Sequence, residues 1–509
     1  MKKINLLLLF CVFVFASCKK DFLEELPEGQ IGVDKYFKSL EEFNQALNGA
    51  YVPLRYVADT AFYMDEMRSD NTHYDYDSKD RGGSGYEQLA DFMDDAENAV
   101  TLQRYKANYI GIHRTNTILD RLEKITFEMS DADKNRIIGE TKALRGHYYF
   151  DLVTHYGGVP LHIHEVTLVQ QANLASSTKE EVYTQIIADL KDAYEKVDVP
   201  KFPQTGRVTK GMVAATLGKV YMSWGKPNEA IPYLEAVTKM GYDLLPNYAD
   251  IFSPTNKNNI ESIFEVQYKA GTDGQQSSFI YRFIPRTPDT KNILGVSFNN
   301  TIGGWNTPTQ DLIDAYEDGD KRLDASIGVV EGTLNSSADF MPTKIVSILD
   351  YKTNDNVVAK YFTRKFFHLP YNMNRNTDDN WMLIRYADVL LLLAEAYNEN
   401  GNSSAALPLL NKVRNRAGLA AIHDGAKENL KKAIAQERRV ELAFENHRWL
   451  DLVRTGKAQE VMTAHGNQLK KIYGYLLANS YHVNENRLIY PIPFRELKLN
   501  TLLEQNPGY

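Results

Sequence analysis

Cysteine is nearly absent from this chain of 509 residues, and its absence narrows the possible classes of protein. The two cysteines, Cys11 and Cys18, both lie within the first eighteen residues. The rest of the chain therefore has no disulfide framework, no CxxC pair and no thiol nucleophile. This excludes a disulfide-stabilised module and a cysteine-dependent enzyme for everything that follows Cys18.

Other absences concern charge, enzyme motifs and long apolar runs. The formal net charge is -8 at pH 7 and no basic cluster offsets it, so we expect no nucleic-acid partner. The sequence contains no HExxH, GxSxG, Walker or GxGxxG signature. After the N-terminal region, no segment is long and uncharged enough to cross a bilayer. The composition, with 24% charged and 43% hydrophobic residues, is typical of a large globular protein.

The N-terminus has the pattern of an export signal. Two lysines precede a short apolar run at residues 4–15, and Phe-Ala-Ser then leads to Cys18. A cysteine at the first mature position resembles the bacterial lipobox, in which that residue carries the lipid. We therefore predict a lipoprotein signal peptide at 1–17 and a lipidated tether at 18–34, anchored to a membrane by lipid. A plain secretory signal with an incidental cysteine is the alternative.

Helical periodicity dominates most of the mature chain. Apolar residues at helical spacing predict helices over 102–122, 133–156 and 178–197. Thr178 and Glu181 fit a capping box at the start of the third. The second ends in Tyr-Gly-Gly-Val-Pro, a strong stop signal.

Two segments, 218–241 and 394–418, align with each other at a constant offset. Each contains a helical pattern, a glycine turn and a second helical pattern with a proline, Pro232 or Pro408, that we expect in its first turn. Such helix pairs resemble tetratricopeptide units, which stack to bury a shared core. Chance similarity between amphipathic hairpins is the alternative.

The helical periodicity is lost in two stretches. Residues 64–99 are polar, aromatic and glycine-bearing, and we expect a long binding loop there. Residues 253–380 are rich in Asn, Thr, Gly and Pro, with strand-like pieces such as Ser262–Tyr268. The predicted fold is mainly α, a tetratricopeptide-like helical-hairpin scaffold with an inserted irregular, loop-rich subdomain that contains a few short strands. The expected parts are an N-terminal scaffold (35–252), the irregular ligand-binding subdomain (253–380) and a C-terminal scaffold with closing segment (381–509).

The segment Glu437–Arg454 is predicted to be one buried helix at the centre of the scaffold. Its apolar residues recur at helical spacing and cover most of its surface. The remaining charged side chains are spaced so that opposite charges could pair along the helix; they are Arg438, Glu441, Glu445 and Arg448.

Metal and hydrolase patterns are weak. The sequence His162-Ile163-His164-Glu165 lacks an identifiable third ligand for zinc, and the cluster Asp75, Asp77 and Asp80 lacks the remaining features of a calcium loop. Adjacent acids such as Asp94 and Asp95 could serve a glycosidase only at a suitable separation in space. We expect no metal, no cofactor and no catalytic residue.

Aromatic residues gather in both irregular stretches, mixed with Asp, Arg and His. Sugar rings pack their C–H faces on flat aromatic surfaces, and their hydroxyls form hydrogen bonds with charged side chains. A helical scaffold that carries such loops is suited to binding carbohydrate. The alternative is that the aromatics only pin long loops to the scaffold.

Several motifs together resemble the SusD/RagB family across almost the whole mature chain. Besides the lipobox, they lie at 140–161 (ETKALRGHYYFDLVTHYGGVPL), 206–225, 315–327, 384–398 (IRYADVLLLLAEAYN), 437–454 and 490–509 (YPIPFRELKLNTLLEQNPGY). The resemblance implies a non-enzymatic lipoprotein on the surface of the outer membrane. It would capture an oligosaccharide and deliver it to a TonB-dependent transporter of the SusC type. A peptide or glycopeptide uptake protein, a surface glycoside hydrolase and a purely structural lid are the alternatives.

The candidate site residues come from the two aromatic stretches, which correspond to the glycan-binding loops that the resemblance implies. We select Trp305 and Tyr74 as stacking platforms, Asp70 and Arg81 as polar anchors, and Tyr281 and His73 as further contacts. The motif at 315–327, with Asp320 and Arg322, is interpreted as structural.

Overall fold

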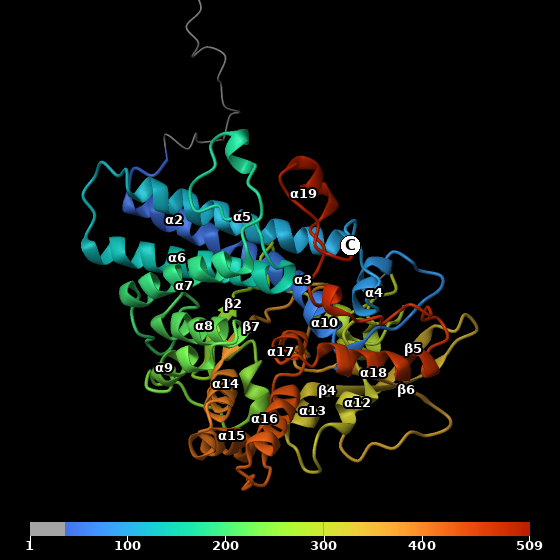
Figure 1. Cartoon of the computed structure of the whole chain (residues 1–509). Coiled ribbons are helices and arrows are strands. Elements are labelled where there is room, and N and C mark those ends of the chain that lie inside the picture. The colour runs from blue at the N-terminus through green and yellow to red at the C-terminus, as the bar shows by residue number, and fades with distance from the viewer. Residues whose placement is uncertain (1–35, 299) are drawn as a thin grey trace, which may run out of the picture.

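A computed structural model describes residues 36–298 and 300–509 of the protein (Figure 1). The predicted signal peptide (1–17), lipidated Cys18 and tether (18–34) lie outside the described residues. Within the described ranges, no helix combines the length and the apolar character that a membrane span requires.

Helices are the predominant secondary structure. The longer ones are α2 (Leu40–Tyr51), α3 (Pro53–Ala61), α4 (Ser84–Ala90), α5 (Ala99–Leu122), α6 (Asp131–Tyr156), α7 (Lys179–Lys196), α8 (Lys210–Ser223), α9 (Pro227–Val237), α14 (Tyr386–Glu399), α15 (Ser403–Ala417), α16 (Lys427–Glu441), α17 (Arg448–Arg454), α18 (Ala458–Ile472) and α19 (Phe494–Leu499). Shorter ones are η3 (Phe62–Glu66, a π-helix), η4 (Val169–Ala172), η5 (Tyr248–Ile251), α10 (Phe279–Phe283), α11 (Lys291–Leu294), α12 (Gln310–Asp314), α13 (Arg322–Ser326) and η6 (Glu485–Leu488).

The helices α5 to α9, α14 and α15 form a continuous array in which each packs on the next (Figure 1). The aligned segments correspond to the hairpins α8–α9 and α14–α15, and α9 packs directly against α14 although the irregular subdomain separates them in sequence. Both hairpins turn at a glycine with positive φ, Gly225 (φ 72) or Gly401 (φ 76). The mainly α, tetratricopeptide-like prediction is confirmed. Pro232 and Pro408, however, lie inside their helices, beyond the first turn.

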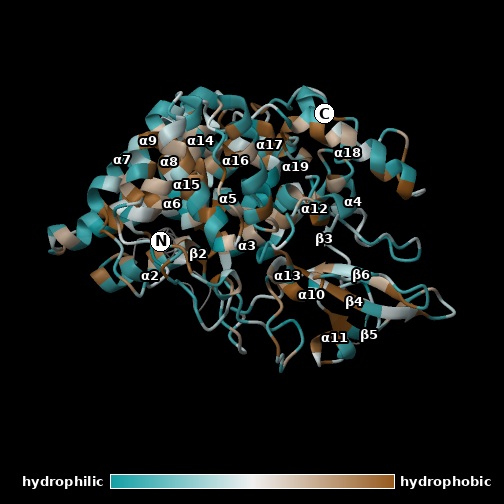
Figure 2. Ribbon diagram, turned by 90° about the horizontal axis from the view of Figure 1, so that it is seen from below, coloured by the Kyte–Doolittle hydropathy of each residue, from teal (hydrophilic) through white to brown (hydrophobic). Residues whose placement is uncertain are grey.

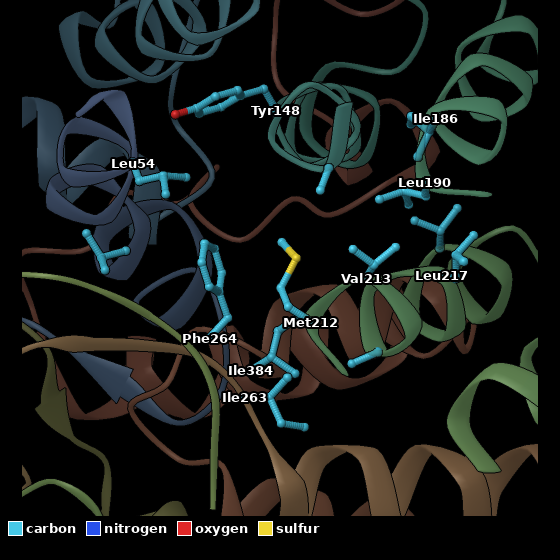
Figure 3. Close-up of a cluster of buried hydrophobic side chains, with 14 of the residues drawn as sticks. Leu54, Tyr148, Ile186, Leu190, Met212, Val213, Leu217, Ile263, Phe264 and Ile384 are labelled. Carbon is cyan, nitrogen blue, oxygen red and sulfur yellow. The ribbon is translucent and has the colours of Figure 1, made fainter. Parts of the chain in front are cut away.

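The main core lies where α3, α6, α7 and α8 meet the strands β2 and β7 (Figure 3). In Figure 3, Met212 of α8 lies beside Phe264 of β2, and Leu190 of α7 lies beside Leu217 of α8. All four side chains are buried, and burial of each large apolar side chain contributes about 1.5–3 kcal/mol. This core fixes the helical array to the irregular subdomain.

Three small antiparallel sheets include strands of the subdomain, and in two of them the partner strand comes from outside it. They are formed by β1 (Thr72–His73) with β3 (Thr307–Pro308), by β2 (Ser262–Val266) with β7 (Trp381–Arg385), and by β4 (Ile327–Leu334) between β5 (Phe340–Val346) and β6 (Val358–Thr363). In Figure 2 the three-stranded sheet, with α11 beside it, lies apart from the helical array. Most of β4 is buried, with Val330 in one apolar cluster and Val329 in another. A strand buried on both faces has no polar-apolar alternation, so its sequence carries little strand signal.

The segment Glu437–Arg454 is not one helix, which corrects the prediction. Helix α16 ends at Glu441, and α17 begins at Arg448 after a turn in which Phe444 and Asn446 both have φ 67. The carboxylate of Glu66 in η3 accepts hydrogen bonds from the backbone N–H groups of Phe444 and Asn446, each at 2.9 Å. These bonds satisfy the donors that the interrupted helix leaves free and support an unfavourable backbone conformation.

The four charged side chains predicted to pair along the helix, Arg438, Glu441, Glu445 and Arg448, do not pair with one another. Glu441 accepts from Arg322 at 2.8 Å, from Arg385 at 2.5 Å, and also from Arg416. Arg438 pairs with Asp388 and Asp451, and Arg448 pairs with Asp70. The segment therefore joins separate parts of the chain, and the structural interpretation of Arg322 agrees with its full burial.

The stretch 64–99 is more ordered than the predicted long loop. It contains the end of η3, strand β1 and helix α4, and residues 61–74 are all buried. Because η3 and β1 lie in the interior, Asp65, Glu66 and His73 form hydrogen bonds with other parts of the chain. The exposed part of the stretch is centred on residues 76–82.

Candidate ligand-binding site

A surface depression of about 430 Å³ lies where the two aromatic stretches meet. It is lined by residues of the segments 80–86, 278–286 and 301–305, together with Tyr63 and Arg375. Its volume falls within the usual range for small-ligand sites.

We call this surface the aromatic depression. Three of the side chains that line it form a cluster of rings, which we call the aromatic wall. Tyr63 and Tyr86 stack with centroids 3.9 Å apart and an interplanar angle of 14°. Trp305 lies edge-on to both, at 5.2 Å from Tyr86 and 5.8 Å from Tyr63. Trp305 and Tyr86 are half-buried, so part of each ring remains available to a ligand. Flat rings fixed by their neighbours suit stacking against an apolar ligand face.

Two glycines set the position of Trp305. Gly303 (φ 92) and Gly304 (φ 82) adopt conformations that favour glycine, and a Cβ on Gly303 would lie 2.3 Å from the carbonyl oxygen of Ile284. The Trp305 N–H donates to the carbonyl of Arg282 at 3.0 Å, and Gly304 N–H donates to Ile284 at 2.7 Å. The indole is thus fixed by backbone contacts with residues 282–284, a segment that contributes Arg282 to the lining of the depression.

The lining of the depression also carries arginines. Arg286 donates to the carboxylates of Asp77 at 3.2 Å and Asp80 at 2.9 Å. Asp75, the remaining acid of the cluster considered for calcium, accepts from Lys360 at 2.8 Å. The three acids are therefore occupied by cationic side chains, and among the described residues no group of acids, histidines or cysteines has the arrangement of a metal site.

A second depression of about 360 Å³ lies beside strands β1 and β3, between β6 and α18. His73 and Tyr74 contribute to its lining. The Tyr74 hydroxyl donates to Asp91 at 2.7 Å, and burial raises the pKa of Asp91 to about 7. His73 lies 2.9 Å from the Tyr475 hydroxyl, and burial lowers its pKa to about 3, so its imidazole is neutral at physiological pH.

Comparison with known proteins identifies the family. A model described as the SusD family matches residues 260–509, and a model described as starch-binding, associating with the outer membrane, matches residues 21–222. The chain belongs to the SusD/RagB family. SusD-like protein P38 of Formosa agariphila is 28% identical, with 99% of this chain and 98% of that protein aligned.

Solved structures of similar proteins share the fold of this SusD/RagB chain. A laminarin-binding SusD-like protein is 28% identical with a TM-score of 0.74, covering 93% of this chain and 100% of the other. Surface glycan-binding protein A from Bacteroides thetaiotaomicron, in complex with laminarihexaose, is 22% identical with a TM-score of 0.72 over 92% of this chain and 99% of the other.

The structure distributes the residues selected from the sequence of this SusD/RagB protein over several places. Trp305 and Tyr281 line the aromatic depression, whereas His73 and Tyr74 line the second depression. Tyr74 is 4% exposed, and its ring centroid lies 6.2 Å from that of Trp305. Its ring therefore packs behind Trp305, between the two depressions. Its assignment as a stacking platform stays a prediction. Arg81 is exposed, pairs with Glu87 and lies over the Tyr76 ring.

Asp70 does not face either depression, which corrects its selection as a polar anchor. Its side chain is buried, and both carboxylate oxygens accept from Arg448 at 2.8 Å, while Arg439 lies at 3.1 Å. Burial works to raise the pKa of Asp70, but the two arginines outweigh it and hold the pKa well below its usual range. Asp94, considered for hydrolysis, is likewise buried and pairs with Arg68 at 2.6 Å.

Sequence reasoning missed several residues around the depressions. Tyr63 precedes the aromatic stretch and lies in the buried π-helix η3, while Tyr475 follows α18 near the C-terminus and stacks on Tyr76 at 4.2 Å. Arg282 and Arg375 also line the aromatic depression. Only the proximity of Arg282 to Tyr281 in the sequence could have suggested it, because the others reach the site through the tertiary fold.

Proposed function

We propose that this protein is a non-catalytic, lipid-anchored binding protein of the cell surface that captures oligosaccharides and delivers them to a TonB-dependent transporter of the SusC type. The transporter would be embedded in the outer membrane, with this protein at its outer side. Trp305 and Tyr86 would contact the ligand, with the largely buried Tyr281 beneath it and Arg81 at the rim. No bond is made or broken in this function.

The observation that carries the proposal is the fixed aromatic wall formed by Tyr63, Tyr86 and Trp305. Pyranose rings present C–H faces that pack on such surfaces, while the neighbouring arginines provide donors for hydroxyl oxygens. The similarity to a laminarin-binding SusD-like protein, at 28% identity over nearly the whole chain, supports a carbohydrate ligand.

The remaining parts of the proposal have their own support. A glycosidase of the usual kind needs two carboxylates at the scissile bond, whereas among the described residues Asp80 is the only acid that lines the aromatic depression. The matched model described as associating with the outer membrane supports the location. The predicted lipidation of Cys18 supports the anchor.

Titration calorimetry of the full-length protein in detergent against a panel of oligosaccharides tests the function. We expect dissociation constants between about micromolar and millimolar. Trp305→Ala should abolish measurable binding, whereas the matched control Trp224→Ala, a half-buried tryptophan that stacks on Tyr183 outside the depression, should retain it. Binding of peptides but of no oligosaccharide would favour peptide uptake, and release of products would favour a hydrolase. Recovery of a transporter on affinity purification from outer membranes would test the partner.

A further inference from the structure

The aromatic depression carries an excess of positive charge in a chain that is negative overall. Arg282, Arg286 and Arg375 line it, whereas Asp80 is the only acid in its lining among the described residues. The formal net charge of the chain is -8. A local reversal of sign at a concave surface attracts ligands of the opposite charge.

The three arginines differ in how completely their charges are matched. Arg286 donates to two carboxylates, those of Asp77 and Asp80, so its charge is already compensated. It orders the loop at the rim and is not free to receive an anion. The excess positive charge therefore resides on the other two arginines.

Arg282 is only loosely paired. Its guanidinium donates to the backbone carbonyl of Asp59 at 3.3 Å, and the nearest Asp59 carboxylate oxygen is 3.9 Å away. Burial raises the pKa of Asp59 more than Arg282 lowers it. A tight ion pair would have the opposite effect. Arg282 thus retains hydrogen-bonding capacity toward the depression that it lines.

Arg375 has no carboxylate within 4 Å in the part of the chain that the structure describes. Its guanidinium lies over the Phe298 ring at 4.7 Å, and its backbone has a φ of 52, a conformation that is uncommon for a side-chain-bearing residue. The side chain is exposed. A guanidinium held over a ring by a constrained backbone is oriented without being neutralised, which suits it to receive an anionic group.

We propose that the aromatic depression recognises an acidic oligosaccharide. A sugar ring packs on Trp305, and its carboxylate or sulfate ester accepts hydrogen bonds from Arg375 and Arg282. Guanidinium groups bind such planar or tetrahedral oxyanions through paired, charge-assisted hydrogen bonds. This inference rests on the proposed function, because it specifies the chemical class of the oligosaccharide that the same depression binds.

Calorimetry with three hexasaccharides tests the inference: neutral laminarihexaose, a hexamer of galacturonic acid and a sulfated galactose hexamer. We expect at least one acidic hexamer to bind about tenfold or more tightly than the neutral one. Arg375→Gln should remove most of that difference, because it weakens binding of the acidic hexamer about tenfold but binding of laminarihexaose only about twofold or less, through loss of a donor to a hydroxyl oxygen. Arg495→Gln, an exposed arginine of α19 outside the depression, makes the same change of charge and should have no effect. Increasing the salt concentration from 50 to 500 mM should weaken only the binding of the acidic hexamer.

The outcomes separate this inference from the function on which it rests. Carboxylate-specific and sulfate-specific binding would each support it and would identify the anionic group. Equal or tighter binding of laminarihexaose, unaffected by Arg375→Gln, would overturn the acidic specificity and leave oligosaccharide capture intact. If no hexamer of any kind bound, and peptides did, both the function and this inference would fail. A second variant, Arg282→Gln, checks that any loss reflects the site and not one residue.

Discussion

The buried ion-pair network around Glu441 and the aromatic depression beside Trp305 contain the same kinds of side chain, but their charges are matched to different degrees. In the network, the buried charges are equal in number, five of each sign. The buried acids are Glu261, Asp320, Glu437, Glu441 and Glu445, and the buried cations are Arg322, Lys365, Arg385, Arg414 and Arg416. Arg414 also pairs with the exposed Glu317 at the edge of the network. In the depression, arginines outnumber acids and remain partly open to solvent.

The difference has an energetic reason. An enclosed charge loses its hydration and is tolerated only where partners replace it. Burial works to raise the pKa of Glu441, but Arg416, Arg385 and Arg322 outweigh it and hold the pKa below its usual range. Once matched in this way, the network has little capacity left to bind a ligand. A half-exposed arginine keeps its hydration and can exchange water for ligand oxygens, so incomplete matching is a property of a binding surface.

Removal of one charge from the network should give the largest effect on stability. Glu441→Gln leaves the three arginines around it without their shared anion, and we expect a loss of about 3–5 kcal/mol in the free energy of unfolding. Chemical denaturation monitored by circular dichroism measures it. Glu460→Gln, which alters an exposed pair with Lys457, is the control and should cost less than about 1 kcal/mol. If Glu441→Gln cost as little stability as the control, the buried ion pairs would contribute no more than exposed ones, and the contrast drawn between the network and the depression would be wrong.

A change at Gly303 should affect the depression more selectively. In Gly303→Ala the new Cβ meets the Ile284 carbonyl oxygen, so Trp305 must shift, and we expect a cost of about 2–3 kcal/mol in stability together with about a tenfold or greater loss of affinity. Gly295→Ala is the control, because Gly295 also has positive φ (73) but no atom within 4 Å of the added Cβ. It should lose stability without losing affinity. Equal affinity losses in both variants would mean that the glycine does not position the indole.

The buried pair Tyr74–Asp91, which lies near the aromatic depression, should make the stability of the protein depend on pH. Because burial raises the pKa of Asp91 to about 7 in the folded state, its contribution to stability is present below the unfolded pKa of about 4 and is lost as the pH rises through 7. We expect the free energy of unfolding to fall by about 2 kcal/mol between pH 5.5 and 8.5 on this account. The charged neighbours act in opposite directions, since Glu87 raises the pKa of Asp91 and Arg81 lowers it.

Urea denaturation at several pH values measures this effect. The variant Asp91→Asn keeps the shape of the side chain and cannot titrate, so its stability should be flatter over the same interval. A wild-type profile with the same slope as that of the variant would contradict the assignment of the effect to Asp91.

The sequence was sufficient to predict the helical array because its signals are local. The capping residues Thr178 and Glu181, the glycine turns at Gly225 and Gly401 and the apolar periodicity of α5 to α7 all act within a few residues. The break between Glu441 and Arg448 was missed, because the carboxylate that stabilises the turn comes from Glu66, far away in the chain.

The sequence points to a region for the site but does not distinguish its residues. Of the residues selected, Trp305 and Tyr281 line the aromatic depression, and their contact with a ligand stays a prediction. Asp70 and Trp305 look equally suited to a ligand in sequence, yet Arg448 and Arg439 enclose the first while two glycines present the second. Which charges are matched depends on partners that only the tertiary fold brings together.

The smallest expected effect on stability concerns Arg81. This residue is paired, like the charges of the network, but it is exposed, like those of the depression. Its pair with Glu87 is partly exposed and its guanidinium lies 4.7 Å from the Tyr76 centroid, so Arg81→Gln should cost no more than about 1 kcal/mol in the free energy of unfolding. If Arg81 belongs to the binding surface, the same variant should weaken oligosaccharide binding about two- to threefold in calorimetry, because an exposed hydrogen bond contributes little. A change in stability without a change in affinity would place Arg81 with the matched, structural charges and would restrict the binding surface to the aromatic wall and to Arg282 and Arg375.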